Sequence, residues 1–143
     1  MTATFFGHGN FQYENIVINE LEKTIEQLIK KGVNKFLLGG YGNFDKTCAE
    51  VICSLKIKYP DIKSILVIPY LNRKYNMNMY DESIYPPLEK IPLKLAIIKR
   101  NQWMIENSEI VVTYVKYSWG GANKSLEYAK QKRKTIINIA DTL

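Results

Sequence analysis

The sequence predicts an α/β protein, and two observations support this fold class. Five short apolar runs alternate along the chain with longer segments of helical periodicity, which is the pattern of a parallel sheet with right-handed crossovers. The runs are continuously apolar rather than alternating, as is typical of strands buried on both faces. We therefore expect a Rossmann-like three-layer sandwich with a five-stranded, mainly parallel sheet. A length of 143 residues fits one domain that spans residues 1–143.

Three strands and two helices are predicted in the first half of the chain. The strands cover residues 3–7, 34–38 and 64–69, and the helices cover residues 14–31 and 44–59. In the first helix the apolar residues recur at helical spacing, and Gly32 follows its last lysines as a stop signal. The second helix ends before Pro60, because the residue that precedes a proline disfavours the helical conformation.

Residues 70–92 break this alternation. They hold four tyrosines and the Pro86-Pro87 pair without a clear period, and a loop this long in a compact domain is often a functional lid. The tyrosines, with Tyr80 in mid-loop, either stack on the base of a ligand or pack the loop onto the sheet. Beyond this segment the sequence predicts helices at 93–107 and 123–132 and strands at 109–115 and 135–139.

The formal net charge is +6, but its pattern favours a solvated surface over a nucleic-acid interface. Three of the twenty basic residues are arginines, Arg73, Arg100 and Arg133, and the rest are lysines. Base readout and bidentate phosphate contacts favour arginine. No apolar run approaches the ~20 residues that span a bilayer, and no signal peptide is apparent. We expect a cytoplasmic protein in which Cys48 and Cys53 are free thiols.

Three predicted loops at the carboxyl ends of strands contain glycine. They are Gly7-His8-Gly9, Gly39-Gly40-Tyr41-Gly42 and Ser118-Trp119-Gly120-Gly121. Open parallel sheets bind ligands outside the carboxyl ends of their strands, and glycine lets backbone N–H groups approach a phosphate. One such loop is also explained by a tight strand-to-helix turn. Three loops that converge on one edge of the sheet indicate a phosphate-binding site.

Arg100 lies on the apolar face of its predicted helix, three residues after Ile97 and four before Met104. A charge in that position needs a partner. A phosphate or carboxylate of a ligand would serve, and the alternatives are an internal salt bridge or a side chain that extends to the surface. The single histidine, His8, has a structural or ligand-binding role rather than a metal-binding one, because no Cys, His and carboxylate cluster has ligand spacing.

Four segments in this order carry a family resemblance. They are Phe5-Phe6-Gly7-His8-Gly9; Gly39-Gly40-Tyr41-Gly42 with Asn43, Asp45 and Glu50; Lys99-Arg100-Asn101 with Trp103-Met104; and Ser118 through Glu127. Across nearly its whole length the chain resembles the SLOG superfamily, which includes the LOG phosphoribohydrolases and the DNA-processing protein A family, and within it a small bacterial and phage branch. LOG enzymes carry PGGxGTxxE in the last segment, whereas in this chain Trp119 replaces the proline and Asn123-Lys124 replaces a glycine.

The resemblance implies a pocket for a nucleoside monophosphate or a related nucleotide. The ligand-binding residues that it implies are Gly7, His8, Gly9, Gly39, Gly40, Gly42, Asn43, Asp45, Glu50, Arg100, Asn101, Ser118, Gly120, Gly121 and Ala122. In LOG enzymes an arginine and a glutamate support cleavage of an N-glycosidic bond, which makes Arg100 and Glu127 the catalytic residues if this chain is an enzyme. Asp45 also fits a helix N-cap, Glu127 fits the first turn of a helix, and Glu50 fits a surface pair with Lys46.

Three functions are compatible with the sequence. The preferred one is a binding module that senses or sequesters a nucleotide-derived small molecule. The second is a phosphoribohydrolase-like N-glycosidase of the LOG type, in which a carboxylate stabilises a developing oxocarbenium ion. The third and least favoured is a DNA-binding protein, which would lose affinity at moderate salt. The resemblance also implies a homodimer, and we expect no cofactor and no metal.

Overall fold

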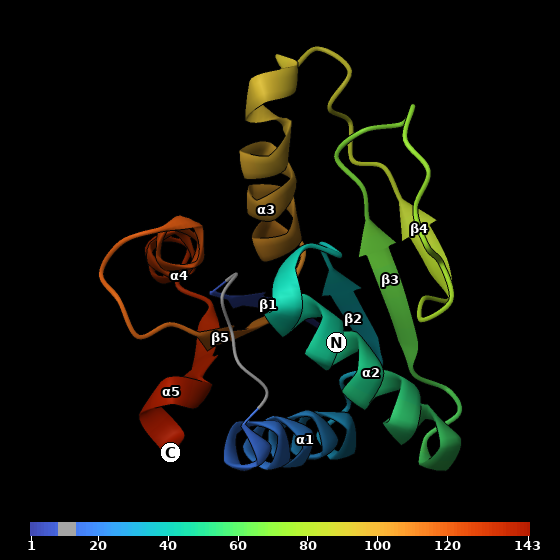
Figure 1. The fold of residues 1–143 in the computed structure, drawn as a ribbon, viewed down its shortest axis with the longest axis vertical. Helices are drawn as coiled ribbons and strands as arrows, with labels where there is room; N and C mark the ends of the chain where they lie inside the picture. Colours follow the sequence, from blue (N-terminus) through green and yellow to red (C-terminus); the bar gives the residue numbers. More distant parts are fainter. Residues whose placement is uncertain (9–13) are drawn as a thin grey trace.

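The computed structural model describes residues 1–8 and 14–143 and confirms the α/β Rossmann-like class. One parallel sheet runs through it in the order β4-β3-β2-β1-β5-β6 (Figure 1). The strands are β1 (Thr2–Gly7), β2 (Lys35–Leu38), β3 (Lys63–Val67), β4 (Glu82–Ile84), β5 (Ile110–Tyr114) and β6 (Thr135–Asn138). The helices are α1 (Asn15–Lys30), α2 (Gly42–Lys58), the 3-10 turn η1 (Leu93–Leu95), α3 (Ala96–Glu106), α4 (Gly121–Gln131) and α5 (Ile139–Thr142).

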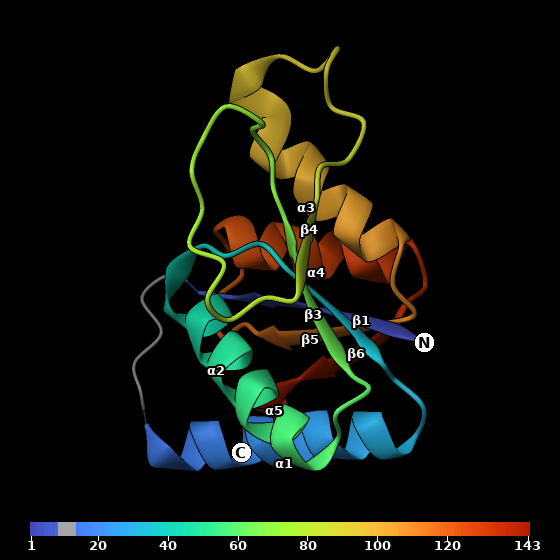
Figure 2. The same ribbon diagram turned by 90° about the vertical axis from the view of Figure 1, so that its right-hand side faces the viewer.

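The helices form two layers, one on each face of the sheet. Figure 2 shows α3 and α4 on one side of the strands and α1, α2 and α5 on the other. Successive side chains of a strand point to opposite faces. Phe5 and Val112 therefore pack towards α1 and α2, whereas their neighbours Phe6 and Val111 pack towards α3 and α4. Burial on both faces explains why the central strands are continuous apolar runs.

The sheet has six strands rather than the five that we predicted. The additional strand, β4, lies inside the 70–92 segment that we expected to be a loop, and it pairs in parallel with β3 at the edge of the sheet. Its three residues are exposed or half-buried. An edge strand of this kind needs no apolar run, so it leaves no strand pattern in the sequence. The short helix α5 was not predicted either.

The strand order reverses beside β1. In the sheet, β2, β3 and β4 follow one another on one side of β1, and β5 and β6 lie on the other side. In open parallel sheets such a reversal leaves a crevice at the carboxyl ends of the strands, where ligands bind. The loops that follow β1, β2 and β5 all begin at this crevice.

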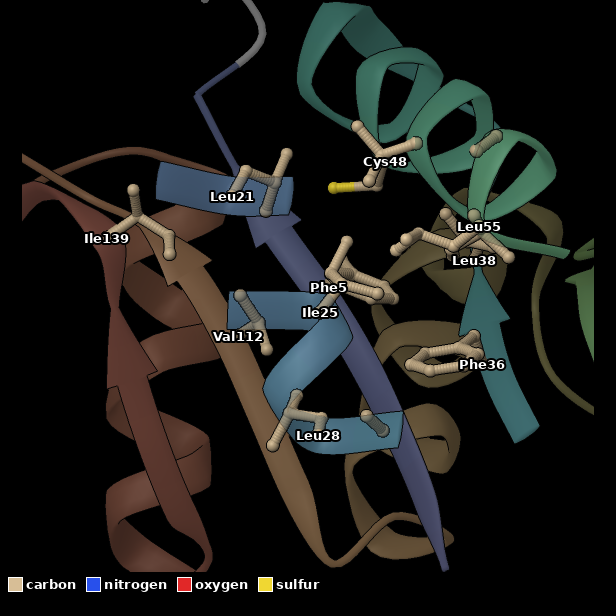
Figure 3. Close-up of a cluster of buried hydrophobic side chains, with 14 of the residues drawn as sticks. Phe5, Leu21, Ile25, Leu28, Phe36, Leu38, Cys48, Leu55, Val112 and Ile139 are labelled. Carbon is tan, nitrogen blue, oxygen red and sulfur yellow. The ribbon is translucent and has the colours of Figure 1, made fainter. Parts of the chain in front are cut away.

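The larger core lies between the sheet and the layer of α1 and α2. In α1, Leu21, Ile25 and Leu28 lie four and three residues apart, so they form one buried stripe. Beneath them the rings of Phe5 and Phe36 stack with centroids 5.9 Å apart. Figure 3 shows these side chains meeting between α1, α2 and the central strands.

Both cysteines are free thiols, as we expected, with Cys48 buried in α2 and Cys53 half-buried one turn later. In the part of the chain that the structure describes, no helix is long and apolar enough to cross a membrane.

We expect Phe36→Ala to lower the free energy of unfolding by about 3–5 kcal/mol, because it removes a fully buried ring and leaves a cavity against Phe5. Ile57→Ala is the matched control. Ile57 is 89% exposed on α2, so its loss should change stability by less than about 0.5 kcal/mol. Urea unfolding followed by circular dichroism measures both values. Equal losses in the two variants would contradict the assignment of the core.

Candidate functional site

One residue of each glycine motif, Gly7, Tyr41 and Gly121, lines a cavity of about 290 Å³ at the carboxyl edge of the sheet, which we call the Arg100 pocket. Its walls come from the end of β1, the loop after β2, the first turn of α2, one face of α3 and the start of α4. The lining residues are Phe6, Gly7, Tyr41, Asp45, Ile97, Arg100, Asn101, Met104, Gly121, Ala122 and Ser125. Residues 97, 100, 101 and 104 are spaced as one face of α3.

The Arg100 side chain is 4% exposed and is held mainly by backbone carbonyl groups. Its Nη1 donates hydrogen bonds to the carbonyl oxygens of Gly39 and Val67, at 3.0 and 2.9 Å. Its Nε donates to the Asn101 Oδ1 at 2.9 Å. Among the described residues, Nη2 makes no hydrogen bond and no carboxylate pairs with Arg100 within 4.0 Å. One edge of the guanidinium is therefore left for a ligand.

Gly39 is part of the Arg100 site because it leaves room for the guanidinium. A Cβ atom on Gly39 would lie 3.1 Å from the Arg100 Cζ and 3.2 Å from its Nη2. These separations are shorter than a relaxed carbon contact. Any larger residue at this position would push the side chain away from the two carbonyl groups. The packing of Arg100 thus explains why the loop after β2 begins with a glycine, Gly39, which lies sixty-one residues earlier in the chain.

Asp45 brings a buried carboxylate to the same pocket. It is 8% exposed and lies in the first turn of α2, where its Oδ2 accepts the N–H of Tyr41 at 3.3 Å. The N-cap residue of α2 is Tyr41 and not Asp45, so Asp45 accepts this hydrogen bond from within the first turn of the helix. Burial raises the pKa of Asp45 to about 6, against the opposing effects of the Tyr41 N–H and the Arg100 charge. Burial likewise lowers the pKa of Arg100, and the Asp45 charge opposes that change.

Gly121 and Ala122, at the start of α4, line the pocket. Gly120 is the N-cap at φ +92°, and Gly121 and Ala122 open the helix. A Cβ atom on Gly120 or Gly121 would meet nothing within 4 Å, so the space above them is open. The first turn of α4 contains no acidic residue. The first N–H groups of a helix lack partners within it and attract anions.

Two expected carboxylates do not line the Arg100 pocket. Glu127 is exposed on α4, and its Oε1 accepts a hydrogen bond from the Lys130 Nζ at 3.3 Å. Glu50 is exposed on α2, and in the described part of the chain it forms no ion pair with Lys46. Asp45 is the carboxylate that the fold brings beside Arg100.

His8 joins β1 to the loop after β5 and does not line the Arg100 pocket. Its Nε2 accepts the N–H of Lys116 at 2.8 Å, and its ring stacks on Tyr117, which in turn stacks on Trp119. Burial, followed by the nearby Lys116 charge, lowers the pKa of His8. Among the described residues no group of three or more His, Cys, Asp or Glu could hold a metal ion. Gly9, also expected at the site, lies outside the described residues.

The remaining expected residues divide between a neighbouring cavity and the surface. Gly40, Gly42 and Asn43 line a second cavity of about 390 Å³ on the far side of the loop after β2. We call it the Lys46 pocket. It is also lined by Lys46, Leu66, Tyr75, Asn76, Met79 and Tyr80. Ser118 is exposed in the loop before α4 and lines neither cavity.

Several lining residues were missed from the sequence. Lys46 directly follows Asp45, and its position in the first turn of a helix after a glycine loop was a usable sign. Tyr41 lies inside the glycine motif itself and is 81% exposed beside the Arg100 pocket. Ser125 had no sign in the sequence, because its burial depends on how α4 lies over β5.

Gly40→Ala should lower the free energy of unfolding by about 2–4 kcal/mol. Gly40 has φ +70°, and its new Cβ would lie 2.5 Å from the Leu66 Cδ1. Gly121→Ala is the matched control, because its Cβ meets nothing within 4 Å. The control should be neutral or gain up to about 1 kcal/mol from helix propensity. Thermal and urea unfolding compare the two, and a neutral Gly40→Ala would contradict the loop conformation.

We expect Asp45→Asn to stabilise the protein in a pH-dependent way. The pKa of Asp45 rises from 3.8 to about 6 on folding, so its contribution to stability is present below pH 3.8 and is lost as the pH rises through 6. Above that pH the free energy of unfolding of the wild type is lower by about 3 kcal/mol, and the variant does not show this loss. Urea unfolding from roughly pH 4 to pH 8 should show the gap opening with pH. A gap that does not change with pH would mean that the carboxylate is not buried.

Comparison with known proteins supports the fold and the family. The chain is 30% identical over 138 residues to the uncharacterised SPbeta prophage-derived protein YoqJ of Bacillus subtilis, covering 79% of this chain and 80% of that protein. Among solved structures, DNA processing protein A from Helicobacter pylori matches with a TM-score of 0.65 at 18% identity. That match covers 95% of this chain and 63% of the other, so the chain spans less than two thirds of it.

The molybdenum cofactor carrier protein of Chlamydomonas reinhardtii matches with a TM-score of 0.61 at 13% identity, covering 94% of this chain and 74% of the other. Both structural matches show a shared fold. The family model YpsA, described as the YspA SLOG family, matches residues 4–140. The match spans β1 through α5, and with it the two cavities at the carboxyl edge of the sheet. The chain therefore belongs to the YpsA SLOG family.

Proposed function

We propose that this protein binds a nucleotide or a nucleotide-derived small molecule in the Arg100 pocket. The observation that carries the proposal is the buried Arg100 guanidinium, whose Nη2 has no hydrogen bond to the described residues. Burying a charge is costly unless it is paired. Two carbonyl groups and one amide oxygen compensate part of this cost, and an anionic ligand would supply the missing charge.

The walls of the pocket favour a phosphate as the anionic group. Arg100 lies on α3, and the first N–H groups of α4, at Gly121 and Ala122, line the same cavity. A phosphate placed between them accepts charge-assisted hydrogen bonds from the guanidinium and from the helix start. A volume of about 290 Å³ is at the lower end for small-molecule pockets. It suits a monophosphate with its sugar rather than a larger polymer.

Two proteins with the same fold bind or carry a ligand. The Helicobacter pylori protein is described as binding single-stranded DNA, and the Chlamydomonas reinhardtii protein is a carrier of molybdenum cofactor. For this chain, sensing or sequestering a nucleotide remains the preferred function.

Asp45 favours N-glycosidic bond hydrolysis as a second candidate function. It lines the pocket with Arg100, and its pKa of about 6 lets it exist in both protonation states near neutral pH. A carboxylate in that position would stabilise an oxocarbenium ion. Incubation with nucleoside monophosphates and detection of free base tests this reaction, and Asp45→Asn should abolish it if it occurs. Glu127→Gln should leave it unchanged, because Glu127 does not line the pocket.

We expect Arg100→Met to weaken nucleotide binding by about thirtyfold or more, because it removes a charged donor while filling a similar volume. Native mass spectrometry and calorimetry with a panel of nucleoside monophosphates measure the loss. Arg133→Gly is the control, since Arg133 is exposed and has φ +58°, a conformation that glycine adopts readily. The mass of the intact protein in native mass spectrometry also tests whether it forms the homodimer that the family resemblance implies.

Three results would contradict the proposal: equal binding by wild type and Arg100→Met, no binding of any nucleotide, or binding of single-stranded DNA that nucleotides do not displace. The last result, with a steep loss of affinity in salt, would favour the DNA-binding alternative.

A further inference from the structure

The Lys46 pocket shares a wall with the Arg100 pocket. The loop after β2 and the first turn of α2 separate the two cavities. Gly40 and Gly42 line the Lys46 pocket, and Tyr41 between them lines the Arg100 pocket. Asp45 and Lys46 are divided in the same way, because consecutive residues of a helix point about 100° apart. Each cavity therefore has one cationic side chain of its own.

The outer wall of the Lys46 pocket is fixed by hydrogen bonds to β3. The Asp81 carboxylate accepts the N–H of Ser64 at 2.9 Å and also pairs with Lys56. The hydroxyl of Ser64 donates to the carbonyl oxygen of Met79 at 2.8 Å. Tyr80 lies between these two anchored residues, so the backbone that carries its ring is held in place before any ligand arrives. In Figure 2 the yellow-green trace of this segment passes beside the start of α2.

Among the described residues, the lining of the Lys46 pocket includes an ammonium group and a phenol hydroxyl but no carboxylate. Within the same part of the chain, neither the Nζ of Lys46 nor the hydroxyl of Tyr80 has a hydrogen-bonding partner. Burial, followed by the Asp45 charge, raises the pKa of Tyr80 to about 12, so the hydroxyl keeps its proton at neutral pH. The rings of Tyr75 and Tyr80 add flat apolar surface. The cavity is suited to an anionic group attached to a ring.

From this arrangement we propose that the two pockets hold the two halves of one ligand, a dinucleotide whose pyrophosphate bridge crosses the loop at Gly42. The inference rests on the proposed function of the Arg100 pocket and extends it. One phosphate lies at Arg100, and the other lies at Lys46 and the Tyr80 hydroxyl. Gly42 has no side chain, so the bridge can pass close to the backbone there, whereas at Gly40 the Leu66 side chain packs against the backbone.

The test compares each nucleoside monophosphate with the matching symmetric dinucleotide, two such units joined by a pyrophosphate, in calorimetric titrations of the full chain. The dinucleotide should bind the wild type about tenfold more tightly. Lys46→Met should remove this advantage and leave the affinity for the monophosphate unchanged. Tyr80→Phe, which removes one hydroxyl, should weaken the dinucleotide alone by about fivefold.

Lys58→Met is the matched control. Lys58 lies at the other end of α2, paired with Glu26, and its loss should leave both affinities at the wild-type value. Equal affinities for the two ligands, unchanged in Lys46→Met, would overturn the second half-site while the Arg100 pocket stands. Failure of both ligands to bind would overturn the proposed function and this inference together. Unfolding temperatures of the variants confirm that the fold is intact.

Discussion

The carboxyl edge of this sheet depends on the hydrogen bonds of one buried guanidinium. Through Nη1, Arg100 joins the carbonyl groups at the ends of β2 and β3 and ties both strands to α3. The contact requires a glycine at position 39 and a helix that brings its polar residue inward. The loop after β2 is thereby held in one conformation, and that loop forms a wall of both cavities. Arg100, which the sequence indicates as a candidate ligand contact, therefore also stabilises the fold at this edge of the sheet.

The pocket balances two buried charges that do not pair directly. Each of Asp45 and Arg100 is disfavoured in its charged form by burial, and each partly compensates the other. By linkage, an anion bound at Arg100 favours the protonated form of Asp45, since it offsets the positive charge that the carboxylate experiences. Binding of an anion at Arg100 would therefore be coupled to proton uptake by Asp45.

The sequence predicted the parts of the fold that depend on local patterns. Continuous apolar runs located five strands, and the glycine motifs located the loops of the site, because both patterns follow from burial and backbone freedom. β4 was not predicted, because its three residues are exposed or half-buried and carry no apolar run. The sequence also did not determine whether Glu127, the glutamate that corresponds to the LOG motif, faces the pocket. Which face of α4 holds Glu127 depends on the length of the preceding loop, and the fold turns it to the surface.

The edge strand β4 also has a consequence for the behaviour of the protein in concentrated solution. An open parallel sheet presents unpaired backbone groups that can recruit a strand from another molecule. In this protein that edge is three residues long, begins with Glu82 in an ion pair with Lys63, and is followed within two residues by Pro86-Pro87. A short charged strand next to two prolines is a poor template for aggregation. The same segment that encloses a cavity thus makes this edge of the sheet a poor site for a strand from another molecule.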